Sequence, residues 1–155
     1  MLNAYAAVVQ RAEGTWTGMG GTMGFGVARV EGEIIINRPV EEVFDFVADE
    51  RNEPHYNPRM VRAEKISEGQ IGSGARFHTE LKMAGRTMPM VVEFTDFERT
   101  RRLGSVTRSS MMETEGALTF ESVPSGTRMC WSWYVRPRGA MKLICLLYTS
   151  DAADE

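Results

Sequence analysis

The stretch GEIIINRPVEEVFDFVADERNEPHYNP, residues 32–58, decides the fold of this chain. It contains most of an apolar strand, predicted over 30–37, and then Pro39, which we expect at the first helical residue because its missing N–H costs nothing there. Apolar residues then recur at helical spacing, which predicts one amphipathic helix: Val40, Val43, Phe44 and Val47. The segment 49–58 holds two prolines, so we expect this helix to break and any second helix to be short.

The rest of the chain alternates apolar and charged residues with a period of two. The alternation is clearest around Phe77, Val92, Leu118 and Trp131. This pattern is typical of one antiparallel sheet with one wet face. Two short helices cannot cover the apolar face of about seven strands, so we expect a long helix after Arg138. The predicted fold class is therefore α+β, with a curved antiparallel sheet.

Length and charge narrow the class of protein. The 155 residues fit one domain. The net charge is −3, and basic and acidic residues are interspersed along the chain. This distribution argues against nucleic acid as a partner. The densest basic stretch is Arg99, Arg101 and Arg102, which we interpret as a solvated hairpin turn rather than an anion site.

The two cysteines, Cys130 and Cys145, form neither a disulfide framework nor a metal-ligand spacing. We expect no metal and no cofactor. No apolar stretch of the sequence is long enough to span a membrane, and the N-terminus lacks the features of a secretory signal. The expectation is a cytoplasmic protein whose oligomeric state the sequence leaves open.

Both ends of the chain differ in character from the middle. Residues 14–26 are nearly half glycine, which predicts that 1–26 is a flexible tail or sequence upstream of the natural start. The string CLLYTSDAADE, residues 145–155, is similar to the translation of a transposon-type sequencing adapter. On this interpretation the domain covers 27–144, the natural protein continues past Ile144, and most of the covering helix is missing.

Four motifs of the sequence are similar to those of a known superfamily. INRPVEEVFDFVAD (36–49), EPHYNP (53–58), GARF (74–77) and PSGTRMCWSWYV (124–135) resemble the SRPBCC superfamily, the START-like helix-grip group that includes polyketide cyclase/dehydrase-type proteins. The similarity covers about residues 30–144. It implies a seven-stranded sheet wrapped around a long C-terminal helix, with a cavity between them that takes hydrophobic small molecules.

The inward parity of the strands selects candidate ligand-binding residues. Aromatic and methionine side chains on an inward face are usually core, so a filled core and a lined pocket both stay open. The candidates are Phe77, Leu81, Val92, Phe94, Leu118, Met129, Trp131 and Trp133.

Three residues are candidates for acid–base chemistry. The resemblance places His55 and Tyr56 at the pocket rim, where the pair would act on a ligand hydroxyl or carbonyl. The alternatives are a solvated histidine and a tyrosine ring packed under the sheet edge. Asp96 shares the inward parity of Val92 and Phe94, so it is either buried beside a partner or in water at the strand end.

No hydrolase triad, phosphate loop or metal motif occurs in the sequence. Three functions remain: carriage of a hydrophobic small molecule, a polyketide cyclase/dehydratase activity, and a protein-interaction module of the co-chaperone kind. An entirely apolar pocket favours the carrier, and a buried polar group in the pocket favours the enzyme. A filled pocket beside an exposed apolar patch favours the partner protein.

Overall fold

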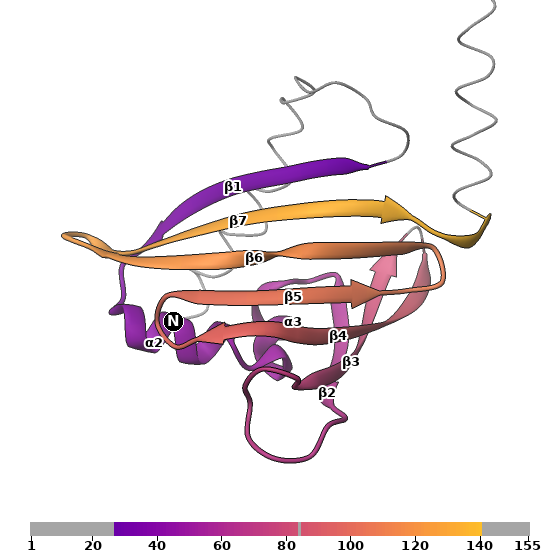
Figure 1. Cartoon of the computed structure of the whole chain (residues 1–155), viewed down its shortest axis with the longest axis horizontal. Coiled ribbons are helices and arrows are strands. Elements are labelled where there is room, and N and C mark those ends of the chain that lie inside the picture. The colour runs from indigo at the N-terminus through magenta and orange to yellow at the C-terminus, as the bar shows by residue number, and fades with distance from the viewer. Residues whose placement is uncertain (1–26, 84, 141–155) are drawn as a thin grey trace, which may run out of the picture.

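The computed structural model describes residues 27–83 and 85–140, which form one antiparallel sheet with helices on one face (Figure 1). The described part holds seven strands in the order β1-β7-β6-β5-β4-β3-β2. Their bounds are β1 (Ala28–Ile36), β2 (Met60–Lys65), β3 (Arg76–Met83), β4 (Arg86–Glu98), β5 (Arg102–Arg108), β6 (Met112–Val123) and β7 (Gly126–Pro137). The predicted α+β helix-grip architecture is confirmed for these residues.

The chain between β1 and β2 forms short helices, as predicted. These are α2 (Val40–Val47), the 3₁₀ turn η1 (Glu50–Asn52) and α3 (Glu53–Tyr56). Pro39 lies one residue before α2, and its carbonyl accepts a hydrogen bond from the Val43 N–H at 3.1 Å. The side chain of Asp49 accepts from the Arg51 N–H and starts η1, so the first helix ends and the chain turns.

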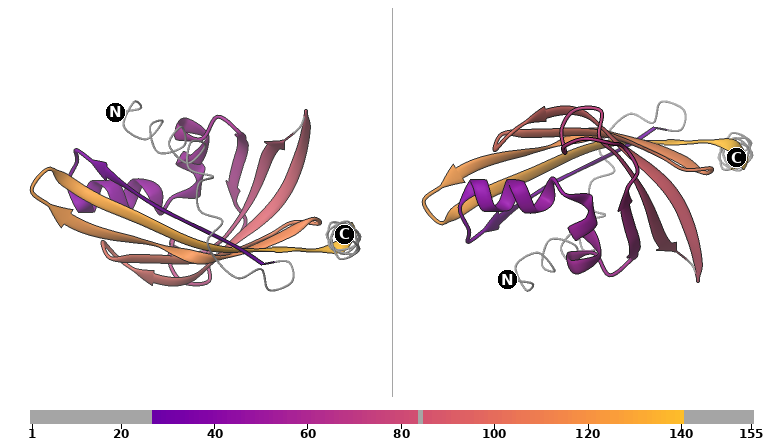
Figure 2. Two further views of the ribbon diagram at one scale, coloured as in Figure 1. Left: turned by 90° about the horizontal axis from the view of Figure 1, so that it is seen from above. Right: turned by 90° about the horizontal axis from the view of Figure 1, so that it is seen from below.

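The sheet is curved, and the helices lie on its concave side (Figure 2). The main core fills the space between them and includes Phe44 of α2, which is fully buried. The Phe44 ring meets Phe97 and Phe120 edge-on, with centroids 5.3 and 5.0 Å apart. At the start of the helix, the buried Thr127 hydroxyl of β7 donates to the Arg38 carbonyl at 2.8 Å. This bond fixes the approach of α2 to the sheet.

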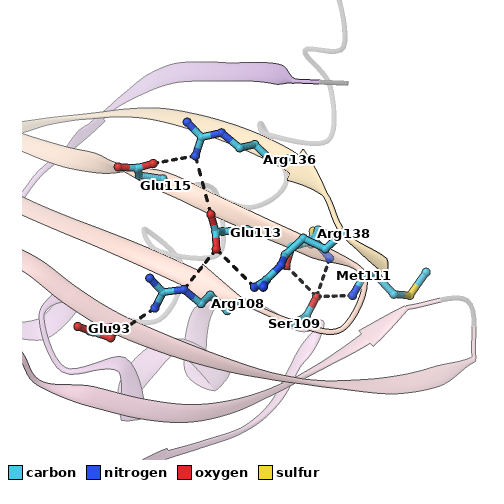
Figure 3. A network of polar contacts seen from close by, with 9 residues as sticks. Glu93, Arg108, Ser109, Met111, Glu113, Glu115, Arg136 and Arg138 are labelled. Carbon is cyan, nitrogen blue, oxygen red and sulfur yellow. Dashed lines mark hydrogen bonds and ion pairs between the residues drawn. The ribbon is translucent and has the colours of Figure 1, made fainter. Parts of the chain in front are cut away.

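The convex face carries a ladder of ion pairs across β4, β5, β6 and β7 (Figure 3). Arg108 bridges Glu93 and Glu113 at 3.4 and 3.3 Å. Glu113 also lies 3.4 Å from Arg138 and 3.9 Å from Arg136. Exposed pairs of this kind each contribute little to stability. They show that the charged parity of these strands faces outward, as the sequence pattern predicts.

The three arginines of the basic stretch lie at the β4–β5 hairpin and are ion-paired. Arg99 reaches across to Asp45 of α2 at 2.8 Å, and Arg102 pairs with Asp96 at 2.7 Å. The hydrogen bond from Arg99 is the main cause that lowers the pKa of Asp45 below its usual range.

The predicted tail 1–26 and the string 145–155 lie outside the described residues, as does nearly all of the expected covering helix. Within the described ranges, no helix is both long and apolar enough to cross a membrane.

Candidate ligand-binding cavity

A cavity of about 410 Å³ opens on the concave face, between the sheet and the segment that runs from α2 to α3. Its volume lies in the range of small-molecule sites. Most of its wall is apolar and comes from the inward positions of six strands together with α2. The apolar lining residues are Val30, Val47, Met60, Met90, Val92, Leu103, Leu118, Met129, Trp131 and Trp133.

Five of the eight predicted ligand-binding residues line this cavity: Val92, Leu118, Met129, Trp131 and Trp133. The register of β6 and β7 sets Leu118 opposite Trp131, so these side chains form one continuous wall. The structure therefore brings together the inward residues of the central strands.

The other three predicted residues lie in the packed core and not on the cavity wall. Phe77 and Phe94 are buried with their rings 5.3 Å apart. Leu81 packs against the methionine cluster formed by Met60, Met88 and Met90. The strand parity is right for all three, but parity cannot distinguish a core position from a cavity position.

Glycines on the neighbouring strands make room for the two indoles. Gly32 of β1 pairs with Trp131, and a Cβ at Gly32 would lie 2.5 Å from the Trp131 Cε2 atom. Gly116 of β6 pairs with Trp133, and a Cβ there would lie 2.8 Å from the Trp133 Cε3 atom. The indoles thus cover glycines and contribute apolar surface to the cavity.

The three acid–base candidates are not brought together. His55 is exposed and absent from the cavity wall. Tyr56 lines the cavity and packs its ring against Phe46, with centroids 6.1 Å apart. The inward parity predicted for Asp96 is wrong, because a β-bulge between Phe94 and Asp96 reverses the alternation. Asp96 is half exposed on the convex face and paired with Arg102.

A pair of carboxyl groups, which the sequence analysis missed, lines the helical side of the cavity. They belong to Glu50 of η1 and Glu53 of α3. Burial, followed by the negative charges of Glu53 and Asp49, raises the pKa of Glu50 well above its usual range. Glu53 accepts a hydrogen bond from the Asn57 amide at 2.9 Å. The raised pKa favours the protonated form of Glu50 relative to an ordinary glutamate.

Two hydroxyl groups, also missed, lie on the sheet side of the cavity. Ser105 and Thr107 of β5 line it, and Ser105 is only 6% exposed. They share the inward parity of Leu103, so the alternation in RLGSVTR is a signal from which they could have been found. No sequence pattern indicated that Glu50 would line the cavity, because it lies in a segment that predicts only a break in the helix.

A second hollow lies on the convex face and has a volume of about 590 Å³. Its lining includes backbone at Gly32 and Gly116 and the outward side chains of Glu31, Glu33, Ser132 and Tyr134. Its rim is polar and includes Cys130, whose thiol pKa is raised by burial and by Glu33. Although this hollow is larger, we assign the candidate site to the concave cavity, where apolar walls and enclosed polar groups occur together.

No group of three or more histidine, cysteine, aspartate or glutamate side chains within the described ranges is arranged to hold a metal ion. The described wall of the cavity offers apolar surface together with carboxyl, amide and hydroxyl groups.

A curved antiparallel sheet that holds short helices and an apolar cavity on its concave face defines the helix-grip class. Residues 27–146 match the family described as polyketide cyclase / dehydrase and lipid transport, and the chain belongs to this family. No curated protein matches the sequence.

Solved structures show the same fold at low sequence identity. The Zhui aromatase/cyclase from Streptomyces sp. R1128 is 15% identical with a TM-score of 0.64, over 73% of this chain and 70% of that chain. The di-domain ARO/CYC BexL from the BE-7585A biosynthetic pathway is 15% identical with a TM-score of 0.62, over 77% of this chain and 39% of that chain. Ara h 8.0201 is 16% identical with a TM-score of 0.59, over 74% of this chain and 80% of that chain.

Proposed function

We propose that this protein binds a hydrophobic small molecule in the concave cavity and carries or sequesters it. The observation that supports the proposal is the continuous apolar wall of Leu118, Met129, Trp131 and Trp133 around a cavity of about 410 Å³. Large apolar side chains that stay half-buried in a cavity gain free energy when a ligand covers them. Membership of a family described by lipid transport and polyketide cyclisation agrees with an apolar ligand.

Binding of the neutral apolar dye N-phenyl-1-naphthylamine tests this proposal. Trp131 lies on the wall, so Trp131→Ala should weaken dye binding roughly tenfold or more, the scale expected for loss of a large apolar contact. Arg128→Ala is the matched control, because Arg128 lies on the convex face and pairs with Glu121. Calorimetry should give one site per chain. Equal losses in the two variants would show that the dye does not occupy the concave cavity.

A second candidate function is a cyclase or dehydratase activity. The observation that favours it is that the cavity is not wholly apolar: Glu50 lines it, and a carboxyl group with a raised pKa can act as a general acid toward a ligand oxygen. Incubation with a 3-hydroxyacyl N-acetylcysteamine thioester, followed by mass spectrometry for loss of water, tests it. Turnover that disappears in Glu50→Gln would support the enzyme, and the absence of turnover in the unaltered chain would support carriage alone.

A further inference from the structure

Methionine side chains make up a large part of the concave cavity wall. Three of them line the cavity: Met60 of β2, Met90 of β4 and Met129 of β7. Met88 is buried with Met60 and Met90 in one cluster, so the methionine surface continues behind the wall. The cavity therefore places a bound molecule beside several thioether groups.

The chemistry that distinguishes a thioether from a hydrocarbon wall is its oxidation by peroxides to a sulfoxide. A peroxide dissolved in water reaches exposed methionines first, and Met83 and Met111 are 38% and 36% exposed. A hydroperoxide with an apolar group would instead collect in the apolar cavity, beside Met60 and Met90. The two kinds of peroxide should therefore oxidise different methionines of the same molecule.

A second observation, an unpaired hydroxyl on β3, distinguishes Met90 from the other wall methionines. Thr79 is fully buried, and its Oγ1 atom has no hydrogen-bond partner among the described residues. Thr79 lies directly opposite Met90 in the antiparallel register, and such residues have Cβ atoms about 4.5–5.5 Å apart. Buried hydroxyls normally have a partner, and a thioether sulfur is only a weak acceptor. A sulfoxide oxygen on Met90 would give the Thr79 hydroxyl the acceptor that it lacks.

We propose that Met90 is an oxidation site at which an apolar organic hydroperoxide, bound in the cavity, transfers one oxygen atom to the thioether. This inference rests on the proposed binding function, because the cavity must first take up the peroxide. The O–O bond breaks and an S–O bond forms, and the sulfur gives two electrons to the peroxide. The peroxide proton passes to the departing oxygen, which leaves as the alcohol. Thr79 is a positioning residue that donates a hydrogen bond to the sulfoxide as it forms.

Two oxidants of different polarity test the site on the full chain, with tandem mass spectrometry to follow each methionine separately. Hydrogen peroxide should oxidise Met83 and Met111 faster than Met90, because they are exposed. Cumene hydroperoxide should reverse this order, because binding holds it beside Met90. Saturating N-phenyl-1-naphthylamine should slow the oxidation of Met90 by cumene hydroperoxide on the order of tenfold, since it occupies the cavity, and leave Met83 and Met111 unchanged.

A variant of Thr79 tests the hydrogen bond to the sulfoxide. Thr79→Val keeps the shape of the side chain and removes the donor, so Met90 should be oxidised roughly two- to tenfold more slowly relative to Met60 in the same molecule, the scale of one net hydrogen bond. A purely structural role of Thr79 would not change this ratio. Thr87→Val is the matched control, because Thr87 is exposed near the start of β4 and does not line the cavity.

The outcomes separate this inference from the proposed function. If the dye binds but both oxidants attack Met83 and Met111 faster than Met90, or the bound dye gives Met90 no protection, the inference is overturned and hydrophobic binding stands. If the dye does not bind and cumene hydroperoxide shows no preference for Met90, the proposed function and the inference fall together. An unchanged ratio of Met90 to Met60 oxidation in Thr79→Val refutes the role of Thr79. The comparison of oxidants uses the unaltered chain, so it holds even if a variant fails to fold.

Discussion

The contact between Trp131 and Gly32 leads to the sharpest stability prediction. A Cβ at Gly32 would lie 2.5 Å from Cε2 and 2.9 Å from Nε1 of Trp131, with Cζ2 closer still. Carbon atoms in ordinary contact lie roughly 3.5–4.0 Å apart, so the indole must move by about 1 Å or more. We expect Gly32→Ala to cost about 1–3 kcal/mol, the usual range for overpacking.

Gly32→Ala should stabilise the fold, rather than destabilise it, once the Trp131 indole is removed. In a Trp131→Ala background the clash is absent, and alanine in a strand gains roughly 0.5–1 kcal/mol over glycine. The coupling free energy between the two sites should therefore be about 1.5–4 kcal/mol. Urea unfolding followed by circular dichroism measures all four corners of this cycle.

A glycine outside the sheet provides the control. A Cβ at Gly72 meets no atom within 4 Å, so Gly72→Ala should leave stability unchanged or raise it slightly. Dye binding gives a second readout, because an indole displaced from Gly32 moves toward the cavity and occupies ligand volume. If Gly32→Ala has the same effect on unfolding with and without the indole, the close approach of the two residues is refuted.

Three further predictions follow from buried groups. Phe44→Ala should cost about 3–5 kcal/mol in urea unfolding, because it empties the centre of the core; a loss below 1 kcal/mol would contradict this placement. Thr127→Val should cost about 1–3 kcal/mol, because it leaves the Arg38 carbonyl without its donor, and an unchanged unfolding midpoint would argue against that bond. The raised pKa of Glu50 favours the folded state at low pH and makes unfolding easier as pH rises from 4.5 through the raised value, because the folded state binds more protons there. Glu50→Gln should therefore gain stability relative to the unaltered chain at pH 8 and lose that advantage near pH 4; a pH-independent difference would contradict the shift.

Over most of the chain, the sequence predicted the helices and strands and which of their side chains point toward the core. The apolar stripe of α2, the break near Asp49 and the inward parity of Met129 and Trp131 all follow from local spacing. The parity is reliable in β7 because charged or polar residues occupy the outward positions almost without interruption. In β4 it failed after Phe94, where one extra residue in a bulge reverses every later side chain and the sequence gives no local sign of it.

Outside the bulge of β4, the sequence by itself determined which residues face inward, and the tertiary structure decided which of those meet a cavity. Phe77 and Val92 have the same kind of sequence pattern and are cross-strand neighbours, yet only Val92 lines the cavity. Likewise, Glu50 and Ser105 come from distant parts of the chain and line one cavity only after the helical segment folds over the sheet. The period of apolar residues shows which side of a helix or strand is buried, because each buried position favours an apolar side chain. Where a buried side leaves empty space depends on how elements far apart in sequence are placed over one another, and no local pattern encodes that distance.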